Sequence, residues 1–584
     1  MKNNDNEIDN AEARSPRHPA DNGPSRRKFL GQVSAALATG AMLGKIPRAS
    51  AQTPAIGDGV AAPGNLLDPR VRQSFAIRVA AATKEALIPV PPHTTNGDEQ
   101  LYPDKSGTYS KVVLQDGIGL VNLAAFNTFR HAITTGRFGD FENIITGGPR
   151  TMNGPLGGRA FALEGSDDVQ FGNATSPANQ INQIVVPPAP AAASEAYGTE
   201  LIELYWASLL RDVAFTDYAS NEIATQAAAE LTTMPTYAGP RDGSGNVTPD
   251  LLFRGPYPGD TLGPYVSQFY LQPTYMGVQP MSQQLVTFVP DVDYMTDPVT
   301  FQQVQNGIDT GATLQFDSQL RYLHNGRGLN SYTHVDVLFQ TFFTAYLVLG
   351  SLGVPVNPGN PYAHAVKQNG FGTFGGPDFA ATMATAAHQA LNNVWYQKWW
   401  IHLRHRPESG GAIARQMLSG FGNTIDVQLN SNVLNSQAVQ ASFNKYGDYF
   451  LSQAFPEGSP SHPSYPTGHG AVAGACITVL KFFFDGYFVI PDPVVSINDG
   501  LSLVPYTGSD QLTVNGELNK LANNVSFAHG LHAGIHWRSD TASSIQLGEA
   551  VAISMLQDRA TTYAEKFTVS FEKIDGTIAT ISNQ

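Results

Sequence analysis

The chain has 584 residues, of which 42% are hydrophobic and 14% charged, a balance typical of a large globular protein and not of a disordered one. Its formal net charge is −14 at pH 7. Nucleic acid and anionic lipid surfaces both require a positive protein surface, so the composition excludes them as general partners. Any site for an anion must therefore be local.

The first 51 residues predict a twin-arginine export signal. Ser25-Arg26-Arg27-Lys28-Phe29-Leu30 is followed by a moderately apolar stretch to Leu43, and Ala49-Ser50-Ala51 suits cleavage before Gln52. A membrane anchor is disfavoured because polar residues and glycines interrupt the stretch. We expect a periplasmic or secreted protein without membrane contact once the signal is removed.

Apolar residues recur at helical spacing in three later segments, which we predict to be core helices. These segments are 201–209, 335–346 and 378–398. The last should end before Arg406-Pro407, because proline disfavours helix at the preceding residue. Stretches rich in Gly, Pro, Asn and Ser separate the helices and predict ordered loops. They span 147–190, 238–263, 357–377 and 491–516.

The chain contains one cysteine, Cys476, within the apolar run 471–484. An exported chain of this composition would have no intramolecular disulfide. Because no pattern that would stabilise a thiolate surrounds Cys476, a buried apolar role is favoured over a nucleophilic one.

Three motifs in the C-terminal half point to one chemistry. Lys398 with Arg406-Pro407 comes first, then Ser464-Tyr465-Pro466-Thr467-Gly468-His469, then Gly534-Ile535-His536-Trp537-Arg538-Ser539-Asp540. The middle motif places a glycine turn before an apolar run, where backbone N–H groups and an imidazole can face one oxyanion. Lysine and arginine neutralise such an anion through charge-assisted hydrogen bonds. Together the motifs predict a site for a tetrahedral oxyanion.

These motifs, in this order, resemble those of the vanadium-dependent haloperoxidases, which share their site with the type 2 acid phosphatases. The pattern is similar to the algal bromoperoxidase branch at Trp395-x-x-Lys398, at Arg406-Pro407-Glu408 and along the stretch 456–469. The resemblance implies an all-α fold of two packed helical bundles with long Gly/Pro-rich loops. It places an N-terminal helical half at 52–330 and the site in a C-terminal bundle at 331–584.

The resemblance also implies a role for each site residue, with vanadate as the cofactor. The residues expected to bind it are Lys398, Arg406, Thr467, Gly468 and His536. His536 would bond directly to the metal, whereas His469 and Lys398 would be catalytic, His469 by transferring protons. The residues expected around this group or at a halide site are Trp395, His462, His529, His532 and Asp540.

Three of these outer residues carry further expectations. His462 matches the algal pattern and favours bromide over chloride. Trp395, which alone would be assigned to the core, matches the same pattern and is expected to line the site. Asp540 either orients a neighbouring group or has a structural role in its helix.

The sequence departs from the family pattern at two positions. Thr467 replaces the usual serine and retains its hydroxyl. Gly530 stands six residues before His536, where the family has a third cationic residue. Losing one charge-assisted hydrogen bond costs about 1.5 to 3 kcal/mol, roughly ten- to a hundredfold in oxyanion affinity. A protonated His529 or His532 is a candidate replacement, and a zinc site with His536 is disfavoured because no carboxylate or cysteine completes it.

The function implied by the resemblance is that of an exported peroxidase. It would use hydrogen peroxide to oxidise bromide or iodide to a hypohalous acid, which halogenates an organic acceptor. A phosphomonoester hydrolase would instead use His536 as nucleophile and His469 as acid. A helical binding protein with a decayed site would bind no oxyanion. Chain length, the extended loops and His462 favour the peroxidase, and relatives imply a homo-oligomer.

Overall fold

A computed structural model describes residues 72, 73, 76, 80, 91–157 and 184–584 of the chain. The chain divides into two units, Met1–Arg72 and Gln73–Gln584, and the fold is that of the second unit. The expected export signal at 1–51 lies outside the described residues. None of the described helices is long and apolar enough to cross a membrane.

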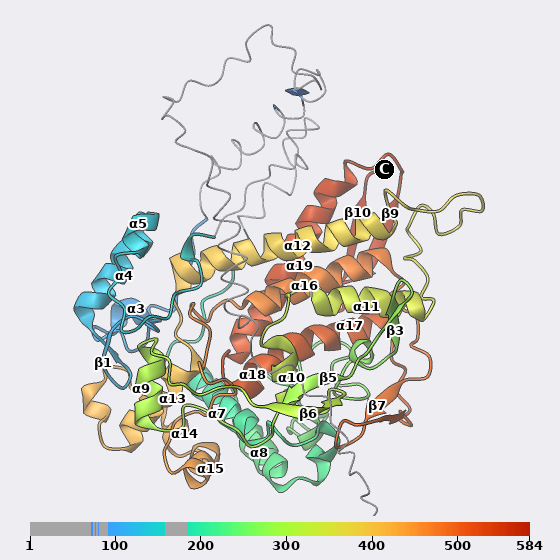
Figure 1. Ribbon diagram of the computed structural model, residues 1–584. Helices are drawn as coiled ribbons and strands as arrows, with labels where there is room; N and C mark the ends of the chain where they lie inside the picture. Colours follow the sequence, from blue (N-terminus) through green and yellow to red (C-terminus); the bar gives the residue numbers. More distant parts are fainter. Residues whose placement is uncertain (1–71, 74–75, 77–79, 81–90, 158–183) are drawn as a thin grey trace, which may run out of the picture. The chain divides into compact units, whose positions relative to one another are not determined.

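Three long helices form the centre of the fold, α12 (Gly376–Tyr396), α16 (Gly468–Phe483) and α19 (Arg538–Ala560), which pack against one another (Figure 1). Every residue of α16 except His469 is buried, as expected of a helix that is apolar on all sides. A methyl group built on Gly474 or Gly548 would lie about 2 Å from a carbonyl oxygen of the facing helix, so both glycines are required for the close approach of α16 and α19.

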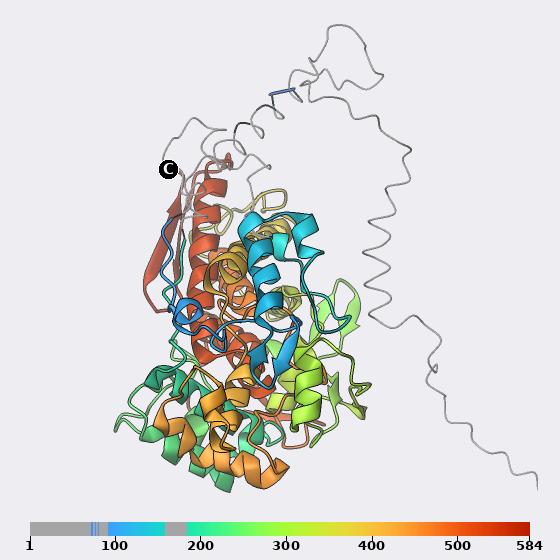
Figure 2. The same ribbon diagram turned by 90° about the vertical axis from the view of Figure 1, so that its left-hand side faces the viewer.

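Shorter helices surround this centre. α11 (Gln340–Ser351) and α17 (Val514–Asn523) pack on α16, whereas a second group gathers around α7 (Glu195–Leu209). The helices in contact with α7 are α8 (Glu222–Thr232), α13 (Pro407–Leu418), α14 (Ser431–Leu434), α15 (Gln437–Tyr446) and α18 (His529–Ala533). α4 (Leu123–Thr135) and α5 (Phe138–Phe141) lie on the side that faces the viewer in Figure 2. The other α-helices are α3 (Asp98–Leu101), α9 (Pro298–Gln305) and α10 (Gly326–Thr333).

Two π-helical segments continue longer helices, η7 (Gln397–His402) after α12 and η9 (Asn524–Ala528) after α17. Single 3₁₀ turns occur at Pro155–Gly157, Phe215–Ser220, Pro249–Leu251, Gln268–Tyr270 and Gly422–Thr424.

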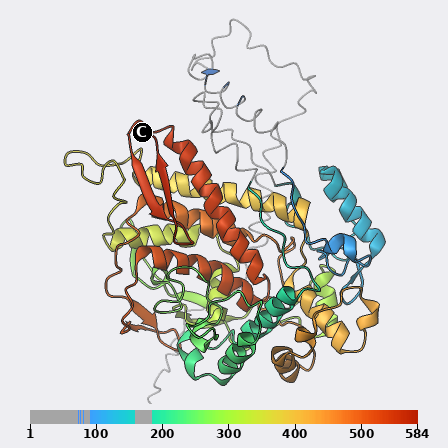
Figure 3. The ribbon, with the colours of Figure 1, turned by 180° about the vertical axis from the view of Figure 1, so that it is seen from behind.

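The described strands form five antiparallel pairs. They are β1 (Gln115–Gly117) with β2 (Leu120–Val121), β3 (Thr274–Met276) with β4 (Gln279–Met281), β5 (Leu285–Phe288) with β6 (Phe316–Arg321), β7 (Val494–Ser496) with β8 (Leu503–Pro505), and β9 (Thr568–Glu572) with β10 (Ile578–Ser582). The β9–β10 hairpin lies along α19 (Figure 3). Because the strands are few and short, the all-α class expected from the sequence is confirmed.

The expected helices 201–209 and 378–398 correspond to α7 and to α12 continued by η7. The helix expected from Val335 begins only at Gln340, and Val335 is 49% exposed. The preceding residues 334–339 form turns and irregular backbone, and within them Asp336 contacts His469 of α16. Cys476 is buried in α16, and burial raises the pKa of its thiol, as expected for a structural cysteine. The division at residue 330 stays a prediction.

Helix ends place the residues of the oxyanion motifs. Pro407 begins α13 and leaves Arg406 at the N-cap, because proline suits the first helical turn. α18 ends at Gly534, whose left-handed backbone (φ 76°) turns the chain toward His536. Thr467 is the N-cap of α16. The three motifs therefore meet where helices begin or end, so that backbone groups with no partner within a helix lie close by.

Candidate active site

Lys398 and Arg406 place two buried cations around one imidazole. Lys398 Nζ lies 2.9 Å from His462 Nδ1, and an Arg406 guanidinium nitrogen lies 2.9 Å from the same atom. As the shared acceptor of Lys398 and Arg406, Nδ1 of His462 would be unprotonated, although the Pro463 carbonyl oxygen also lies 3.1 Å from it. Burial, followed by the charges of Lys398 and Arg406, holds the pKa of His462 well below its usual value.

Among the described residues, no carboxylate bonds directly to either cation, although the charge of Asp540 attracts both. The hydrogen-bond partners of Arg406 are two imidazoles and the carbonyl oxygens of His462 and Ile535, and the partner of Lys398 is an imidazole. Burial and the charge of Arg406 lower the pKa of Lys398 well below its usual value. Burial lowers the pKa of Arg406 to about 10. The pair is therefore a concentrated positive charge that an anion would stabilise.

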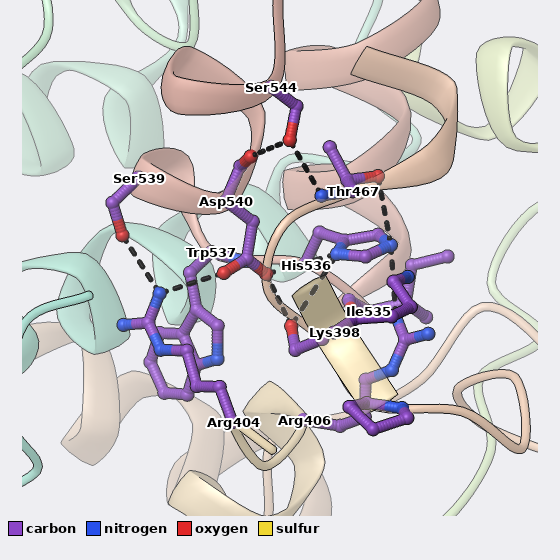
Figure 4. Close-up of polar contacts among 12 residues, drawn as sticks. Lys398, Arg404, Arg406, Thr467, Ile535, His536, Trp537, Ser539, Asp540 and Ser544 are labelled. Atoms are coloured by element: carbon purple, nitrogen blue, oxygen red, sulfur yellow. Dashed lines mark hydrogen bonds and ion pairs between the residues drawn. The ribbon is translucent and has the colours of Figure 1, made fainter. Parts of the chain in front are cut away.

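His536 directs its two ring nitrogens to different groups (Figure 4). Nδ1 lies 3.0 Å from the Asp540 carboxylate, whereas Nε2 lies 2.9 Å from an Arg406 nitrogen and 3.2 Å from Thr467 Oγ1. A carboxylate only accepts, so the proton is on Nδ1 and Nε2 presents its lone pair. Burial, and then Arg406, lowers the pKa of His536 to about 3, so the ring is neutral at pH 7.

Asp540 contacts His536 and also caps the first turn of α19, so its geometry is compatible with both roles considered for it from the sequence. Its carboxylate accepts hydrogen bonds from the Trp537 backbone N–H at 3.0 Å, from Arg404 at 2.8 Å and from the Ser464 hydroxyl. Burial favours the neutral acid, but Arg404 and the bond from His536 outweigh it and hold the pKa of Asp540 well below its usual value.

Sequence reasoning missed Arg404, Ser464 and Glu200 in this network. Arg404 lies 3.0 Å from Glu200, which also accepts a hydrogen bond from the Ser539 hydroxyl. Arg404 could have been considered from the sequence because it stands two residues before Arg406. Nothing in the sequence linked Glu200 to the site, since it lies in α7, far from the three motifs.

The first turn of α16 contributes Thr467, Gly468 and His469. Thr467 Oγ1 contacts His536 Nε2, while its backbone N–H donates to Ser544 Oγ at 2.7 Å. His469 Nε2 lies 3.0 Å from Asp336 Oδ1, a contact that sequence reasoning also missed. This bond places the proton of a neutral His469 on Nε2 and leaves Nδ1 as an acceptor.

Trp395 and His462 lie together, as expected. Their ring centres are 4.7 Å apart, and Lys398 Nζ lies 5.2 Å from the centre of the Trp395 ring. The indole N–H donates to the Gly154 carbonyl at 2.7 Å, which fixes the ring. Trp395 is partly buried, packs against a hydrophobic cluster on one side and lies beside Lys398 on the other, and its role in the site stays a prediction.

His529 and His532 point in different directions from α18. His529 bonds to the Thr333 hydroxyl, and its ring lies 5.1 Å from that of His469. His532 bonds to the Ala207 carbonyl at 3.0 Å and packs on Phe253, so the structure does not bring it to the cations.

Burial holds the pKa of His529 well below its usual value and lowers that of His532 to about 4. Neither histidine therefore supplies positive charge at pH 7 in this state. A methyl group built on Gly530 would lie 3.0 Å from His536 Cβ, so the backbone of Gly530 packs directly beside His536.

The chain is similar to known proteins over most of its length. A family model described as the VCPO second helical-bundle domain matches residues 378–565. A vanadium-dependent bromoperoxidase of Ascophyllum nodosum is 33% identical over 527 residues, which cover 87% of this chain and 91% of that protein. This chain belongs to the vanadium-dependent bromoperoxidase family. The bromoperoxidase of the same description from Corallina pilulifera is 30% identical over 605 residues, covering 88% of this chain and 99% of that one.

A solved structure supports the same conclusion for the fold. The homohexameric second vanadate-dependent bromoperoxidase of Ascophyllum nodosum aligns with a TM-score of 0.79 at 28% identity, covering 94% of this chain and 96% of that one. The family resemblance and the helical fold expected from the sequence are confirmed. The role that the resemblance assigns to each individual site residue stays a prediction.

Proposed function

We propose that this chain is a vanadate-dependent haloperoxidase that uses hydrogen peroxide to oxidise bromide or iodide to a hypohalous acid. The observation that carries the proposal is the pair of buried cations, Lys398 and Arg406, beside the lone pair of His536 Nε2. Removing a charge from water is costly unless a partner compensates it. Vanadate supplies both the missing negative charge and a metal centre for the imidazole.

Each residue of the site has a separate proposed role in binding vanadate. Arg406, Lys398 and the Thr467 hydroxyl would donate hydrogen bonds to the oxyanion, together with the Gly468 N–H at the start of α16. His536 would hold the metal through the lone pair of Nε2, because the bond to Asp540 keeps the ring proton on Nδ1. Bound vanadate acts as a Lewis acid that activates hydrogen peroxide without changing its oxidation state.

Protons are handled by His469. The net reaction consumes bromide, hydrogen peroxide and one proton and yields hypobromous acid and water, so a group that delivers protons is required. His469 is suited to this role because its side chain is 21% exposed and Asp336 holds its Nε2 proton. Lys398, held beside His462 and Trp395, would be the catalytic cation that polarises hydrogen peroxide at the site.

The two alternatives from the sequence are not favoured. The relatives are described as bromoperoxidases and not as phosphatases. A decayed site would have no reason to keep two uncompensated cations in the interior, where their burial destabilises the fold.

The test is an assay of the chain from Gln52 with and without orthovanadate. We expect bromination of a dye by bromide and peroxide that depends on vanadate, with little hydrolysis of p-nitrophenyl phosphate measured in parallel. Hydrolysis without bromination would establish the phosphatase instead. Inactivity in both assays, with no vanadate bound, would establish the decayed site.

We also propose twin-arginine export and assembly into a homo-oligomer. The Arg26-Arg27 pair supports export, and the homohexameric relative supports assembly. N-terminal sequencing of the periplasmic fraction should begin at Gln52 and should fail to detect an Arg26→Lys, Arg27→Lys variant. Light scattering of the purified chain should give a mass several times that of the monomer; a monomeric mass would exclude the homo-oligomer.

A further inference from the structure

The sulfur atoms of the chain are the groups that a hypohalous acid would oxidise first, because thiolates and thioethers are readily oxidised side chains. The chain contains one cysteine and ten methionines, of which Met1 and Met42 lie outside the described residues. Reaction with a dissolved oxidant also requires access to the sulfur. Exposure therefore decides which of the described sulfur atoms can react.

Most of the described sulfur atoms are shielded by the fold. Cys476 is 0% exposed, and burial raises the pKa of its thiol, so that little thiolate forms. The Met417 sulfur accepts a hydrogen bond from the Leu429 N–H at 3.3 Å. The buried methionines are Met234, Met295, Met383 and Met555. The partly buried ones are Met152, Met281 and Met417.

Met276 is the exception among the described residues. It lies in β3 (Figure 1) and is 48% exposed, more than any other methionine that the structure describes. A two-residue turn at Gly277 and Val278 joins β3 to β4, and Val278 is 99% exposed. The end of this hairpin is therefore open to solvent, and a dissolved oxidant can reach the Met276 sulfur without any opening of the fold.

The hairpin lies at the end of α11 that is remote from the site. Thr274, in β3, contacts Ser351, the last residue of α11, with their hydroxyl oxygens 3.2 Å apart. Asp336, which bonds to His469, precedes the first residue of α11. A helix of this length spans about 18 Å. An oxidant held at the site is therefore too far away to react with Met276, whereas one released into solution is not.

We infer that Met276 is a modification site, which the hypobromous acid released by this chain converts to methionine sulfoxide. The inference rests on the proposed function. Sulfoxide formation makes an apolar side chain polar, which disrupts a protein core but adds little strain to an exposed strand. The modified chain therefore keeps its fold and its activity.

The step balances with the reagents that the proposed function supplies. The thioether sulfur bonds to bromine as the O–Br bond breaks and hydroxide departs. A water oxygen then bonds to sulfur as bromide leaves, so sulfur loses an electron pair and bromine gains it. The departing hydroxide takes up one proton of this water, and the other is released. Bromide is thus returned, and the sulfoxide oxygen comes from water.

The experiment locates the sulfoxide by mass spectrometry of peptides. The vanadate-loaded chain turns over hydrogen peroxide and bromide in oxygen-18 water without an organic acceptor, and a parallel sample lacks bromide. Tribromide formation reports bromide oxidation before and after the treatment. The variant is Met276→Leu, and the matched control is Met281→Leu, in the paired strand β4. In a separate arm, the vanadate-free chain receives less than one equivalent of reagent hypobromous acid.

We expect most of the sulfoxide at Met276 in both arms, with solvent oxygen and only when bromide is present during turnover. Met276→Leu should lose most of the total sulfoxide and Met281→Leu little of it, with unchanged tribromide formation in both. Preferential oxidation of another methionine by the reagent would overturn the inference alone. So would tribromide formation without Met276 sulfoxide, or a sulfoxide that carries peroxide oxygen. Absence of tribromide from the wild type would overturn the proposed function and the inference with it.

Discussion

Lys111 and Lys398 are both buried, with exposures of 2% and 0%, yet their surroundings differ in one respect. Lys111 Nζ lies 2.6 Å from Glu408 and 2.9 Å from the Glu457 carbonyl oxygen. Lys398 has a neutral imidazole in place of a carboxylate. Burial, and to a lesser degree the charge of Arg406, lowers the pKa of both lysines. Direct contact with Glu408 keeps the pKa of Lys111 at about 7, whereas Lys398, which is attracted by Asp540 without contact, has a pKa well below its usual value. The charge of Lys111 is therefore paired with a carboxylate of the protein, whereas that of Lys398 is available to pair with an anionic ligand.

The arginines repeat this contrast. Arg404 is paired with Asp540 and Glu200, and Arg538 is paired with Glu203. Arg406, two residues from Arg404, has no carboxylate partner among the described residues. Burial alone therefore does not separate structural cations from functional ones, but their partners do.

The largest effect should follow from Lys111→Met. The change leaves Glu408 buried without its cation, which lowers the free energy of unfolding by about 3 to 5 kcal/mol in urea denaturation of the vanadate-free chain. Adding Glu408→Met should recover much of the loss, since replacing both partners is often nearly neutral. A loss below about 1 kcal/mol would show that Glu408 does not depend on Lys111 and would weaken the comparison.

Lys398→Met is the matched change at the unpaired cation. The free energy of unfolding without vanadate should stay the same or rise, because an uncompensated buried charge is removed. Affinity for orthovanadate, measured by calorimetry, should fall roughly ten- to a hundredfold. Destabilisation as large as that expected for Lys111→Met would instead assign Lys398 a structural role.

Asp540→Asn changes a residue that contacts both the paired cation Arg404 and the ligand-binding residue His536. Arg404 keeps Glu200, so the fold should hold, but His536 loses the carboxylate that fixes its proton on Nδ1. Loss of such an orienting partner typically lowers metal affinity about tenfold or more. Unchanged vanadate affinity at preserved stability would show that Asp540 only begins α19.

The pH dependence of oxyanion affinity should be the smallest effect. Without a ligand the pKa of Lys398 is lowered, and a bound oxyanion would raise it. At a pH above the ligand-free pKa, oxyanion binding is therefore accompanied by uptake of one proton. Affinity should therefore fall as pH rises, by up to about tenfold per pH unit in that range. Lys398→Arg, which stays charged, should have a shallower slope than the wild type in phosphate titrations. Parallel slopes would mean that Lys398 does not titrate on binding.

The resemblance of three motifs to the haloperoxidase pattern predicted Lys398, Arg406, Thr467 and His536 as members of one site, and the structure brings Arg406, Thr467 and His536 into contact. The contacts Arg404–Glu200 and His469–Asp336 could not be predicted, since they join distant segments and leave no local pattern.

His529, His532 and His536 are separated by three and four residues, a spacing that would place them on one face of a continuous helix. They do not share a face, because α18 stops before Gly534 and His536 lies beyond the helix. The helix expected over 335–346 begins only at Gln340. Its apolar spacing included Val335, which is 49% exposed and lies before the helix.

A crystal structure of the chain soaked in orthovanadate tests the central claim most directly. We expect density for vanadium bonded to His536 Nε2, with its oxygens in hydrogen-bond range of Lys398 Nζ and the Arg406 guanidinium. Vanadate bound elsewhere, or none at saturating concentration with Lys398 still bonded to His462, would contradict the claim that these unpaired cations are kept for it.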